Sequence, residues 1–470
     1  MLARRAGSAV PEKTIKNRAY TVKITGIGSE GQGVGHLGSG CAVFVPGALP
    51  GEIVSALIIT VKTNYCVGKL IDIIEPSPNR VNPPCPVYGK CGGCGLLHCS
   101  YPYQLEIKRQ LLGQAFKHIG RFSSLPLPPV TGMSNPFRYR NKSSFPVSVS
   151  DRSPAIGFYS KRSHRIIPIS DCLVDHEVNP KVIQSVSEYM RRFNISAYNE
   201  NTGGGLLRHV LLRVGFSTDE VMVCLVINGG SVPGIPALAE SLKADIPGFA
   251  TLALNINKKR TNVIMGGSSR AVYGPGFIHD NIGDLRFEIS PSSFYQINPV
   301  QTKVLYDTAL EFAGLTGKET VVEAYSGIGA ISLYLARFAG HVYAAEIAAE
   351  AVKDAGRNAE INGIANVTFF NDNAETWLPE FCGRYSIKPD VCVVDPPRKG
   401  CGAGLLQAIA ALPARKLIYV SCDMGTLARD TRLLNDMGYT LTKLQPVDMF
   451  PQTPHVEAVA LLEWQAGNSG

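Results

Sequence analysis

From residue 290 onward, short apolar runs alternate with segments whose apolar residues recur at helical spacing. The runs VVEAY, HVYAAE, VTFFN, VCVVD and LIYVSC predict strands, and the segments between them predict helices at residues 330–338, 349–361, 402–411 and 425–437. Such alternation indicates a parallel sheet with helices on both faces. Residues 290–470 are therefore predicted to form an α/β domain.

The front of the chain has a different pattern, in which short strand-like runs are separated by glycine and proline. The runs AYTVKITGI, GVGHL, CAVFVPG, EIVSALII and CVGKLIDII predict a small β-barrel over residues 14–75, a module that often binds nucleic acid. Four prolines between residues 76 and 84 place a domain boundary near residue 75. Residues 1–13 are basic and lead into no apolar run, so we expect a mobile tail and no secretory signal.

Residues 76–289 mix helical and strand-like patterns and predict an α+β middle domain. Its first element, residues 101–120, has the spacing of an amphipathic helix ended by Gly120, and we expect this helix to pack on the α/β domain. No run of about eighteen apolar residues occurs, so no membrane span is expected.

The net charge of +8 is unevenly distributed along the 470 residues. Residues 1–215 contain 26 lysines and arginines and 12 acidic residues, a net charge of +14, whereas residues 216–470 have a net charge of −6. A basic front half joined to a mildly acidic back half suggests that a polyanion is held next to a catalytic domain. The alternative is a solvated basic surface without a partner.

Five of the 12 cysteines lie between residues 85 and 99 or at position 172. Without a secretory signal we expect the reducing cytoplasm, where clustered thiols are better explained as metal ligands than as disulfides. Cys85, Cys91 and Cys94 lie in CPVYGKCGGCG, whose glycines let the backbone fold around an inorganic centre. The fourth ligand would be the nearby Cys99 or the distant Cys172, and the spacing fits either zinc or an iron-sulfur cluster.

A glycine-rich turn follows the first strand of the α/β domain, in VVEAYSGIGAISLYLA. Gly327 and Gly329 let a ligand approach the backbone and the start of a helix. Glu346 ends the next strand, where this type of fold places an acid on a ribose diol. Asp372 ends the third strand and could reach an adenine edge. In the alternative interpretation both carboxylates only cap helices.

Cys422 follows the strand LIYVS, so its thiol is expected at the carboxyl edge of the sheet, where open α/β folds carry out their chemistry. A thiolate there can add to an electron-poor carbon. Asp395 opens a rigid turn, Asp-Pro-Pro-Arg, and Glu457 lies in an apolar setting that raises a carboxyl pKa toward that of a useful base. The alternatives are a packed core thiol, a purely structural turn, and an ion pair of Glu457 with an arginine.

The motifs CPVYGKCGGC, SPSSFYQINPVQ, YSGIGAISL, DPPRKG, SCDMGTLARD and DMFPQTPHVE occur in this order. In them the chain resembles the bacterial-type RNA uracil-C5 methyltransferases that carry an N-terminal TRAM barrel and an iron-sulfur cluster. The resemblance spans residues 14–464. It implies a Rossmann-like class I methyltransferase domain over residues 290–470, an OB-like TRAM barrel over residues 14–75 and a central RNA-binding domain over residues 76–289.

The resemblance also implies roles for individual residues. A structural 4Fe-4S cluster would be held by Cys85, Cys91, Cys94 and Cys172, which selects Cys172 over Cys99. The positions that match S-adenosylmethionine and target-site residues are Gln296, Tyr325, Glu346 and Asp395. Cys422 matches the nucleophile and Glu457 the proton acceptor.

The implied chemistry compensates for the weak nucleophilicity of uracil C5. Cys422 would add to C6 and create an enolate at C5 that attacks the sulfonium methyl group. Glu457 would then remove the C5 proton, and elimination would leave 5-methyluridine. The base must leave its stack, so the basic front half would hold a remodelled or looped RNA. The forms DPPRKG and SFYQINPVQ resemble the ribosomal-RNA branch, which favours 23S rRNA over tRNA, and no obligate protein partner is expected.

Two departures from the family pattern leave every reacting group in place. Asp423-Met424 stands where Asn-Pro is common, and Glu323 opens the cofactor turn where Asp is usual. Two other functions compete with this one. A cytosine-C5 RNA methyltransferase would need a second cysteine in the acidic turn, and DPPRKG has none. A nonenzymatic RNA-binding assembly factor would have no need of Cys422, Glu457 and the cofactor turn together.

Overall fold

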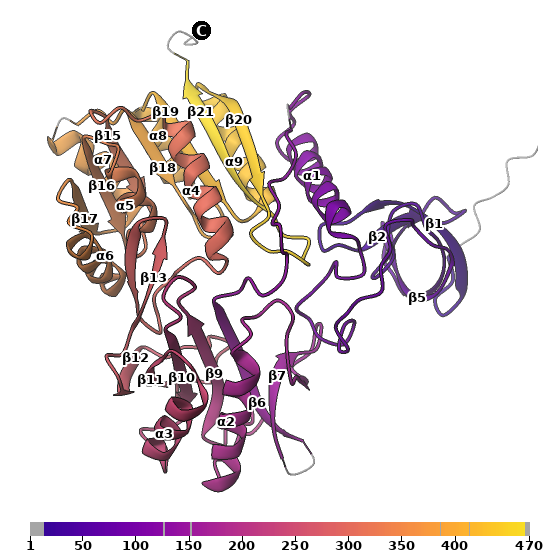
Figure 1. Cartoon of the computed structure of the whole chain (residues 1–470). Coiled ribbons are helices and arrows are strands. Elements are labelled where there is room, and N and C mark those ends of the chain that lie inside the picture. The colour runs from indigo at the N-terminus through magenta and orange to yellow at the C-terminus, as the bar shows by residue number, and fades with distance from the viewer. Residues whose placement is uncertain (1–13, 126, 151–152, 386, 413, 466–470) are drawn as a thin grey trace, which may run out of the picture. The chain divides into compact units, whose positions relative to one another are not determined.

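The computed structural model describes residues 14–125, 127–150, 153–385, 387–412 and 414–465 (Figure 1). The tail predicted at residues 1–13 lies outside the described residues. The chain divides into two compact units. The barrel unit comprises Met1–Gly89, Gly93–Leu111 and Gln452–Pro454, and the larger unit comprises Lys90–Gly92, Leu112–Pro451 and His455–Gly470.

The barrel unit contains a closed barrel of five strands, paired in the order β1-β2-β3-β5-β4. The strands are β1 (Ala19–Ile27), β2 (Gly33–His36), β3 (Ala42–Val45), β4 (Ile53–Val61) and β5 (Tyr65–Glu75). Every second residue along the first part of β4 is buried, so one side of the strand fills the interior. The interior is aliphatic, with Val22, Ile24, Val43, Val45, Val54, Ala56 and Ile58. The predicted barrel is thus confirmed.

The larger unit begins with a seven-stranded sheet in the order β12-β11-β10-β9-β6-β7-β8. Its strands are β6 (Lys142–Ser150), β7 (Ser153–Tyr159), β8 (Ile166–Pro168), β9 (Leu207–Val214), β10 (Val221–Ile227), β11 (Phe249–Ile256) and β12 (Ser268–Tyr273). Helices α2 (Asn179–Arg192) and α3 (Ile235–Asp245) belong to the same region. All residues of β9 and β10 are buried, as in strands covered on both faces.

A short hairpin, β13 (Ile278–Ile282) and β14 (Leu285–Ile289), leads from this sheet into a second one. The second sheet has the order β17-β16-β15-β18-β19-β21-β20 (Figure 1). Its strands are β15 (Thr320–Ala324), β16 (His341–Glu346), β17 (Val367–Asn371), β18 (Val391–Val394), β19 (Lys416–Ser421), β20 (Tyr439–Val447) and β21 (Glu457–Trp464). Strands β15 to β19 are parallel, and β21 runs antiparallel to both of its neighbours.

Helices lie along the chain between these strands. They are α4 (Pro299–Ala313), α5 (Ala330–Ala336), α6 (Ala349–Ile361), α7 (Ala374–Tyr385), α8 (Ala403–Ala411) and α9 (Met424–Asp436). The sequence pattern predicted α5, α6, α8 and α9 to within two residues but neither α4 nor α7. Pro379 interrupts the helical pattern of α7. The start of α4 could have been predicted from the dipeptide Asn298-Pro299, because asparagine is a favoured capping residue and proline a favoured first residue of a helix.

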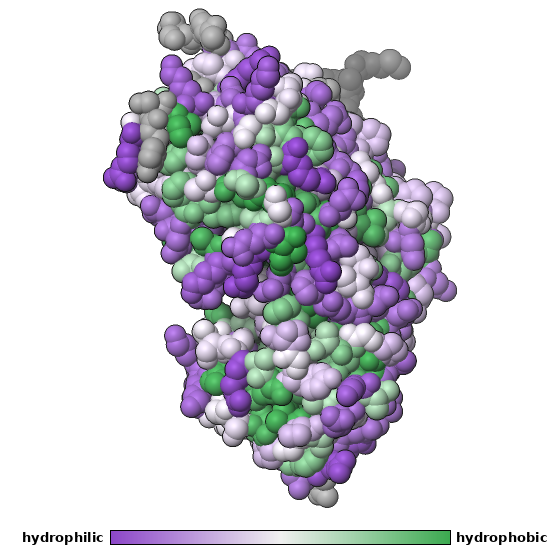
Figure 2. Space-filling view, turned by 60° about the vertical axis from the view of Figure 1, so that its left-hand side comes forward, coloured by the Kyte–Doolittle hydropathy of each residue, from purple (hydrophilic) through white to green (hydrophobic). Residues whose placement is uncertain are grey.

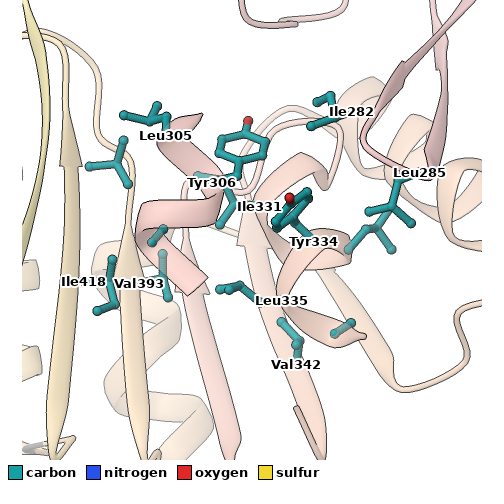
Figure 3. Close-up of a cluster of buried hydrophobic side chains, with 14 of the residues drawn as sticks. Ile282, Leu285, Leu305, Tyr306, Ile331, Tyr334, Leu335, Val342, Val393 and Ile418 are labelled. Atoms are coloured by element: carbon teal, nitrogen blue, oxygen red, sulfur yellow. The ribbon is translucent and has the colours of Figure 1, made fainter. Parts of the chain in front are cut away.

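Two apolar cores cover the two faces of the second sheet, because successive residues of a strand point to opposite sides. Val321 faces the core formed with α4 and α5, and Val322 faces the core formed with α7, α8 and α9. Figure 3 shows the first core, with Leu305, Tyr306, Ile331, Tyr334 and Leu335 of the helices packed over Val342, Val393 and Ile418 of the sheet. The end of α1 (Tyr101–His118) contributes Leu112 and Phe116 to the second core.

Within the described residues, no helix has the length and apolar character that a membrane span requires. The face shown in Figure 2 mixes hydrophilic and hydrophobic side chains, and the hydrophobic ones form small separate groups.

Candidate active site

The carboxyl edge of the second sheet gathers most of the predicted site residues. Tyr325 follows β15, Glu346 ends β16, Asp372 follows β17, Asp395 follows β18 and Cys422 follows β19. The chain runs outward from β15 through β16 to β17 and then returns to β18 on the other side. The strand order therefore reverses between β15 and β18, where open α/β sheets bind their ligands.

Glu457 reaches the same edge from the opposite direction. It is the first residue of β21, which is antiparallel to β19, and Ser421 pairs with Ala458. The next residues outward along these two strands are Cys422 and Glu457. The register therefore places the predicted nucleophile and the predicted base side by side at the end of one strand pair.

One oxygen of the Glu457 carboxyl group has no partner. The side chain is buried, and its Oε2 atom makes no hydrogen bond within the described part of the chain. Burial and, to a smaller extent, the nearby Asp395 raise the pKa of Glu457 to about 8. Among the described residues no arginine forms an ion pair with Glu457. A buried polar atom without a partner is costly unless it faces a ligand.

Cys422 is half-buried and is held as a neutral thiol in the free protein. Burial, followed by the charges of Glu457 and Asp395, raises its pKa to about 11, although Arg398 acts in the opposite direction. Burial also raises the pKa of Asp395 to about 7. The edge thus combines a thiol with two carboxyl groups that titrate near neutral pH. A thiol can act as a nucleophile, and such carboxyl groups can act as general acids or bases.

The glycine-rich turn has the open backbone that the sequence predicted. Gly327 and Gly329 have positive φ angles of 55° and 80°, and Tyr325 adopts a φ of 67°, which is unusual for a residue with a side chain. Ser326 is buried, and its hydroxyl oxygen has no hydrogen-bond partner among the described atoms. Strained backbone and an unpartnered hydroxyl group in one turn are typical of a ligand-binding loop.

Glu346 connects this turn to the next strand. Its Oε2 accepts a hydrogen bond from the Gly327 amide at 3.1 Å, and its Oε1 accepts one from the Ala348 amide at 2.8 Å. Asp372 is exposed, and its carboxylate accepts from the Asn373 amide at 2.7 Å. The amide of Asp372 donates to the Glu346 carbonyl at 3.1 Å, so these two predicted residues lie together.

Gln296 lies in the loop before α4 and is buried. Its carbonyl oxygen accepts a hydrogen bond from the Asn141 side chain at 2.8 Å. Two residues later, the Asn298 side chain donates to the Met449 carbonyl at 3.1 Å, just beyond the carboxyl end of β20. This contact ties the start of α4 to the edge that carries Cys422.

Asp430 is a supporting residue that the sequence reasoning missed. It is buried on α9, and its Oδ2 accepts from the Cys401 amide at 2.9 Å and from the Tyr419 hydroxyl at 2.7 Å. Arg429 donates to the Lys399 carbonyl at 3.0 Å. These contacts fix the turn that begins at Asp395. The signal for Asp430 was its helical spacing of seven residues from Asp423, the helix-capping residue within the motif SCDMGTLARD.

The two departures at Asp423 and Glu323 have structural explanations. Asp423 caps α9 by accepting from the Thr426 amide at 2.9 Å, a role that Asn would also perform. Glu323 is buried, and the Ser332 hydroxyl donates to its Oε2 atom. Burial raises the pKa of Glu323 to about 8.

Comparisons with known proteins agree with this geometry. Residues 278–465 match the family described as tRNA (Uracil-5-)-methyltransferase, and residues 13–71 match the TRAM domain. A protein of Halalkalibacterium halodurans named as an uncharacterized RNA methyltransferase is 47% identical over 448 residues, which cover 95% of this chain and 97% of that protein. The chain belongs to the RNA uracil-5-methyltransferase family. A similarly named protein of Caldanaerobacter subterraneus is 47% identical over 444 residues, covering 94% of this chain and 98% of that protein.

A solved structure extends the likeness to nearly the whole methyltransferase chain. The tRNA (uracil-54, C5)-methyltransferase of Pyrococcus abyssi, solved with S-adenosyl-L-homocysteine, has a TM-score of 0.75 and 27% identity, covering 94% of this chain and 99% of that one. The predicted enzyme class and the class I methyltransferase fold are thus confirmed. This protein is an S-adenosylmethionine-dependent RNA methyltransferase.

The cysteines predicted to hold a cluster form no disulfide within the described part of this methyltransferase. Cys85 and Cys94 belong to the barrel unit, and Cys91 and Cys172 belong to the larger unit. All four are half-buried, whereas Cys99 is buried, and burial raises its pKa to about 12. The described residues contain no group of three or more histidine, cysteine or acidic side chains arranged to hold a metal ion. Four cysteine thiolates would supply the donor set that a 4Fe-4S cluster needs. The cluster itself stays a prediction.

Proposed function

We propose that this enzyme transfers the methyl group of S-adenosylmethionine to C5 of a uridine in 23S rRNA through a covalent adduct between Cys422 and C6 of the base. The observation that carries the proposal is that Cys422 and Glu457 come directly after the last pair of β19 and β21, Ser421 with Ala458, and that Oε2 of the buried Glu457 makes no hydrogen bond among the described residues. A nucleophile without a base could not complete this reaction, because the proton on C5 must leave.

The steps follow from the two side chains. The Cys422 sulfur adds to C6, and the resulting enolate attacks the methyl group at C5, so that S-adenosylhomocysteine leaves. The Glu457 carboxylate takes the C5 proton and the C6–sulfur bond breaks, which forms 5-methyluridine and releases the Cys422 thiolate. Exchange of protons with water then restores the Cys422 thiol and the Glu457 carboxylate. Because the Cys422 thiol is neutral in the free protein, it must lose its proton to water when the uridine binds, before the sulfur can add to C6.

The other residues bind and orient the two substrates. We assign the cofactor to the turn at Tyr325, Gly327 and Gly329, with the Glu346 carboxylate accepting from ribose hydroxyl groups and the exposed Asp372 next to the adenine. We assign Gln296 and Asp395 to the cofactor as well, at the side of the site where the target base must lie. A carboxyl group with a pKa of about 7 can donate to or accept from the edge of uracil.

The choice between RNA substrates rests on the motifs DPPRKG and SFYQINPVQ, which favour 23S rRNA. The alternative is tRNA, on which the Pyrococcus abyssi neighbour acts. The deciding experiment offers labelled S-adenosylmethionine with unmodified 23S rRNA and with unmodified tRNA, followed by digestion to nucleosides. We expect label in 5-methyluridine from 23S rRNA. Label from tRNA alone would overturn the substrate, and label in 5-methylcytidine would overturn the reaction.

We further propose that Cys85, Cys91, Cys94 and Cys172 hold a structural 4Fe-4S cluster and that the enzyme works in the reducing cytoplasm. Replacing any one of the four by serine is expected to remove most of the iron and acid-labile sulfide, because a cluster of this kind needs four thiolates. The measurement is the metal and sulfide content of anaerobically purified protein. Cys99→Ser is the matched control and should keep its iron; zinc in place of iron, or iron lost only with Cys99, would contradict the assignment.

A further inference from the structure

Two basic side chains face each other on the central sheet of the larger unit. Lys142 on β6 is directly opposite Arg213 on β9 in an antiparallel register, so both side chains lie on the same face of the sheet. Lys142 is half-buried, and Arg213 is buried. Like charges in this position repel each other, and strand pairs usually avoid them.

The described residues supply no anion to this pair. Arg213 donates from Nη2 to the carbonyl oxygens of Ser293 and Pro291, while its buried Nε has no partner. Lys142 makes no hydrogen bond or ion pair with any residue that the structure describes. Burial and the charge of Arg213 lower the pKa of Lys142 to about 7. In the free enzyme the charged form of Lys142 is therefore poorly stabilised, as expected of a side chain that binds an anionic ligand.

The pair lies under the loop that leads to the active site. Ser293, which Arg213 holds, is three residues before Gln296, and Asn141, next to Lys142, holds the Gln296 carbonyl. Between them Phe294 is 67% exposed, although its neighbours Ser293 and Tyr295 are buried. An anion at Lys142 would therefore be close to the segment that we place at the side of the site where the target base must lie.

We propose that Lys142 and Arg213 bind a phosphate group of the RNA backbone next to the target uridine. The inference rests on the proposed function. A nucleotide that leaves its stack must be held by its backbone, and phosphate is the anion that RNA offers at every nucleotide. The carboxylate of the cofactor has the same charge, but the cofactor turn at Tyr325 to Gly329 is on the other sheet.

The test compares Lys142→Met with the wild-type full-length protein. Affinity for an unmodified 23S rRNA fragment is measured at several salt concentrations, together with calorimetric affinity for S-adenosylhomocysteine and the midpoint of thermal unfolding. We expect RNA affinity to fall about ten-fold and the slope of log affinity against log salt to shrink by about 0.7 to 1. Affinity for S-adenosylhomocysteine should stay unchanged, and the unfolding midpoint should rise because a poorly paired cation is gone.

Two further variants make the result specific. Lys142→Arg keeps the charge and should keep most of the salt slope. Lys181→Met removes an exposed lysine of α2 and should change neither the slope nor the unfolding midpoint. A Lys142→Met protein with wild-type RNA affinity and slope would overturn the proposal, as would a lower unfolding midpoint with unchanged RNA binding, which indicates a structural lysine. Weaker binding of S-adenosylhomocysteine would assign the site to the cofactor. Failure of the proposed function would appear separately, as wild-type protein that binds RNA but leaves no 5-methyluridine.

Discussion

Replacing Cys422 by alanine is expected to reduce methyl transfer by about 10⁴-fold or more, the usual consequence of deleting a nucleophile. The reason is chemical: C5 of uracil acquires its reactivity only after addition at C6, and Cys422 is the thiol that the sheet presents beside Glu457. RNA affinity should change by less than about three-fold, because the sulfur contributes little to the basic surface that holds the backbone. The measurement is single-turnover transfer of labelled methyl, with RNA affinity measured alongside.

Cys392→Ala is the control for this variant. Cys392 is a buried thiol on β18 of the same sheet and faces the core, so its loss should affect stability more than the reaction. Turnover by Cys422→Ala at a rate comparable with Cys392→Ala would mean that no covalent adduct forms at this residue. Loss of RNA binding in Cys422→Ala would instead show that the cysteine supports the fold.

Replacing Glu457 by glutamine should trap the enzyme on its RNA. The first half of the reaction does not need this carboxylate, so methyl transfer to the adduct proceeds, but removal of the C5 proton slows by about 10² to 10⁴-fold. A protein–RNA species that carries the methyl label should then accumulate on a denaturing gel. It should be absent from the Cys422→Ala/Glu457→Gln double variant. Glu463→Gln, on the same strand β21, should turn over normally.

The same carboxyl groups determine how the wild-type enzyme responds to pH. Glu457 has a pKa of about 8 and Asp395 one of about 7, so the base becomes available as pH rises, and turnover should increase between pH 6 and 9. Stability has the opposite sign. Both pKa values are above those of the unfolded chain, so the folded state binds these protons more tightly, and the stability they contribute is lost as pH rises through 7 to 8. A flat rate profile over this range, or accumulation of free product by Glu457→Gln at the wild-type rate, would remove Glu457 from the mechanism.

The sequence predicted the position of a residue in the fold well wherever that residue ends a strand or immediately follows one. Cys422, Asp395 and Glu346 could be placed at one edge because parallel strands end at the same side of a sheet. Gln296 was harder, because it lies in a loop whose position depends on hydrogen bonds to Asn141, 155 residues earlier. The role of Asp430 was equally hard to predict, because it depends on hydrogen bonds to Cys401 and Tyr419, which lie on other segments of the chain.

Three further features could not be predicted from local sequence, and the first of them depends on strand register. Lys142 and Arg213 are 71 residues apart in the chain, and nothing in either segment alone reveals that the two residues face each other on neighbouring strands. Helix α7 was missed because Pro379 breaks its local pattern, while packing of Trp377, Leu378 and Phe381 into the core still stabilises it. The cysteines are a third case. Their spacing shows that several lie close together in the sequence, but it does not show which of them would bind the same metal centre.

The high pKa of Cys422 also affects how fast this thiol reacts with oxidants and electrophiles. Alkylating agents and peroxides react with thiolates, and a thiol with a pKa of about 11 is almost entirely protonated at neutral pH. The proposed nucleophile is therefore a protonated thiol of low reactivity when no RNA is bound. Cysteine enzymes whose catalytic thiol has a lowered pKa carry a reactive thiolate at all times, whereas the Cys422 thiol of this protein is protonated in the absence of RNA.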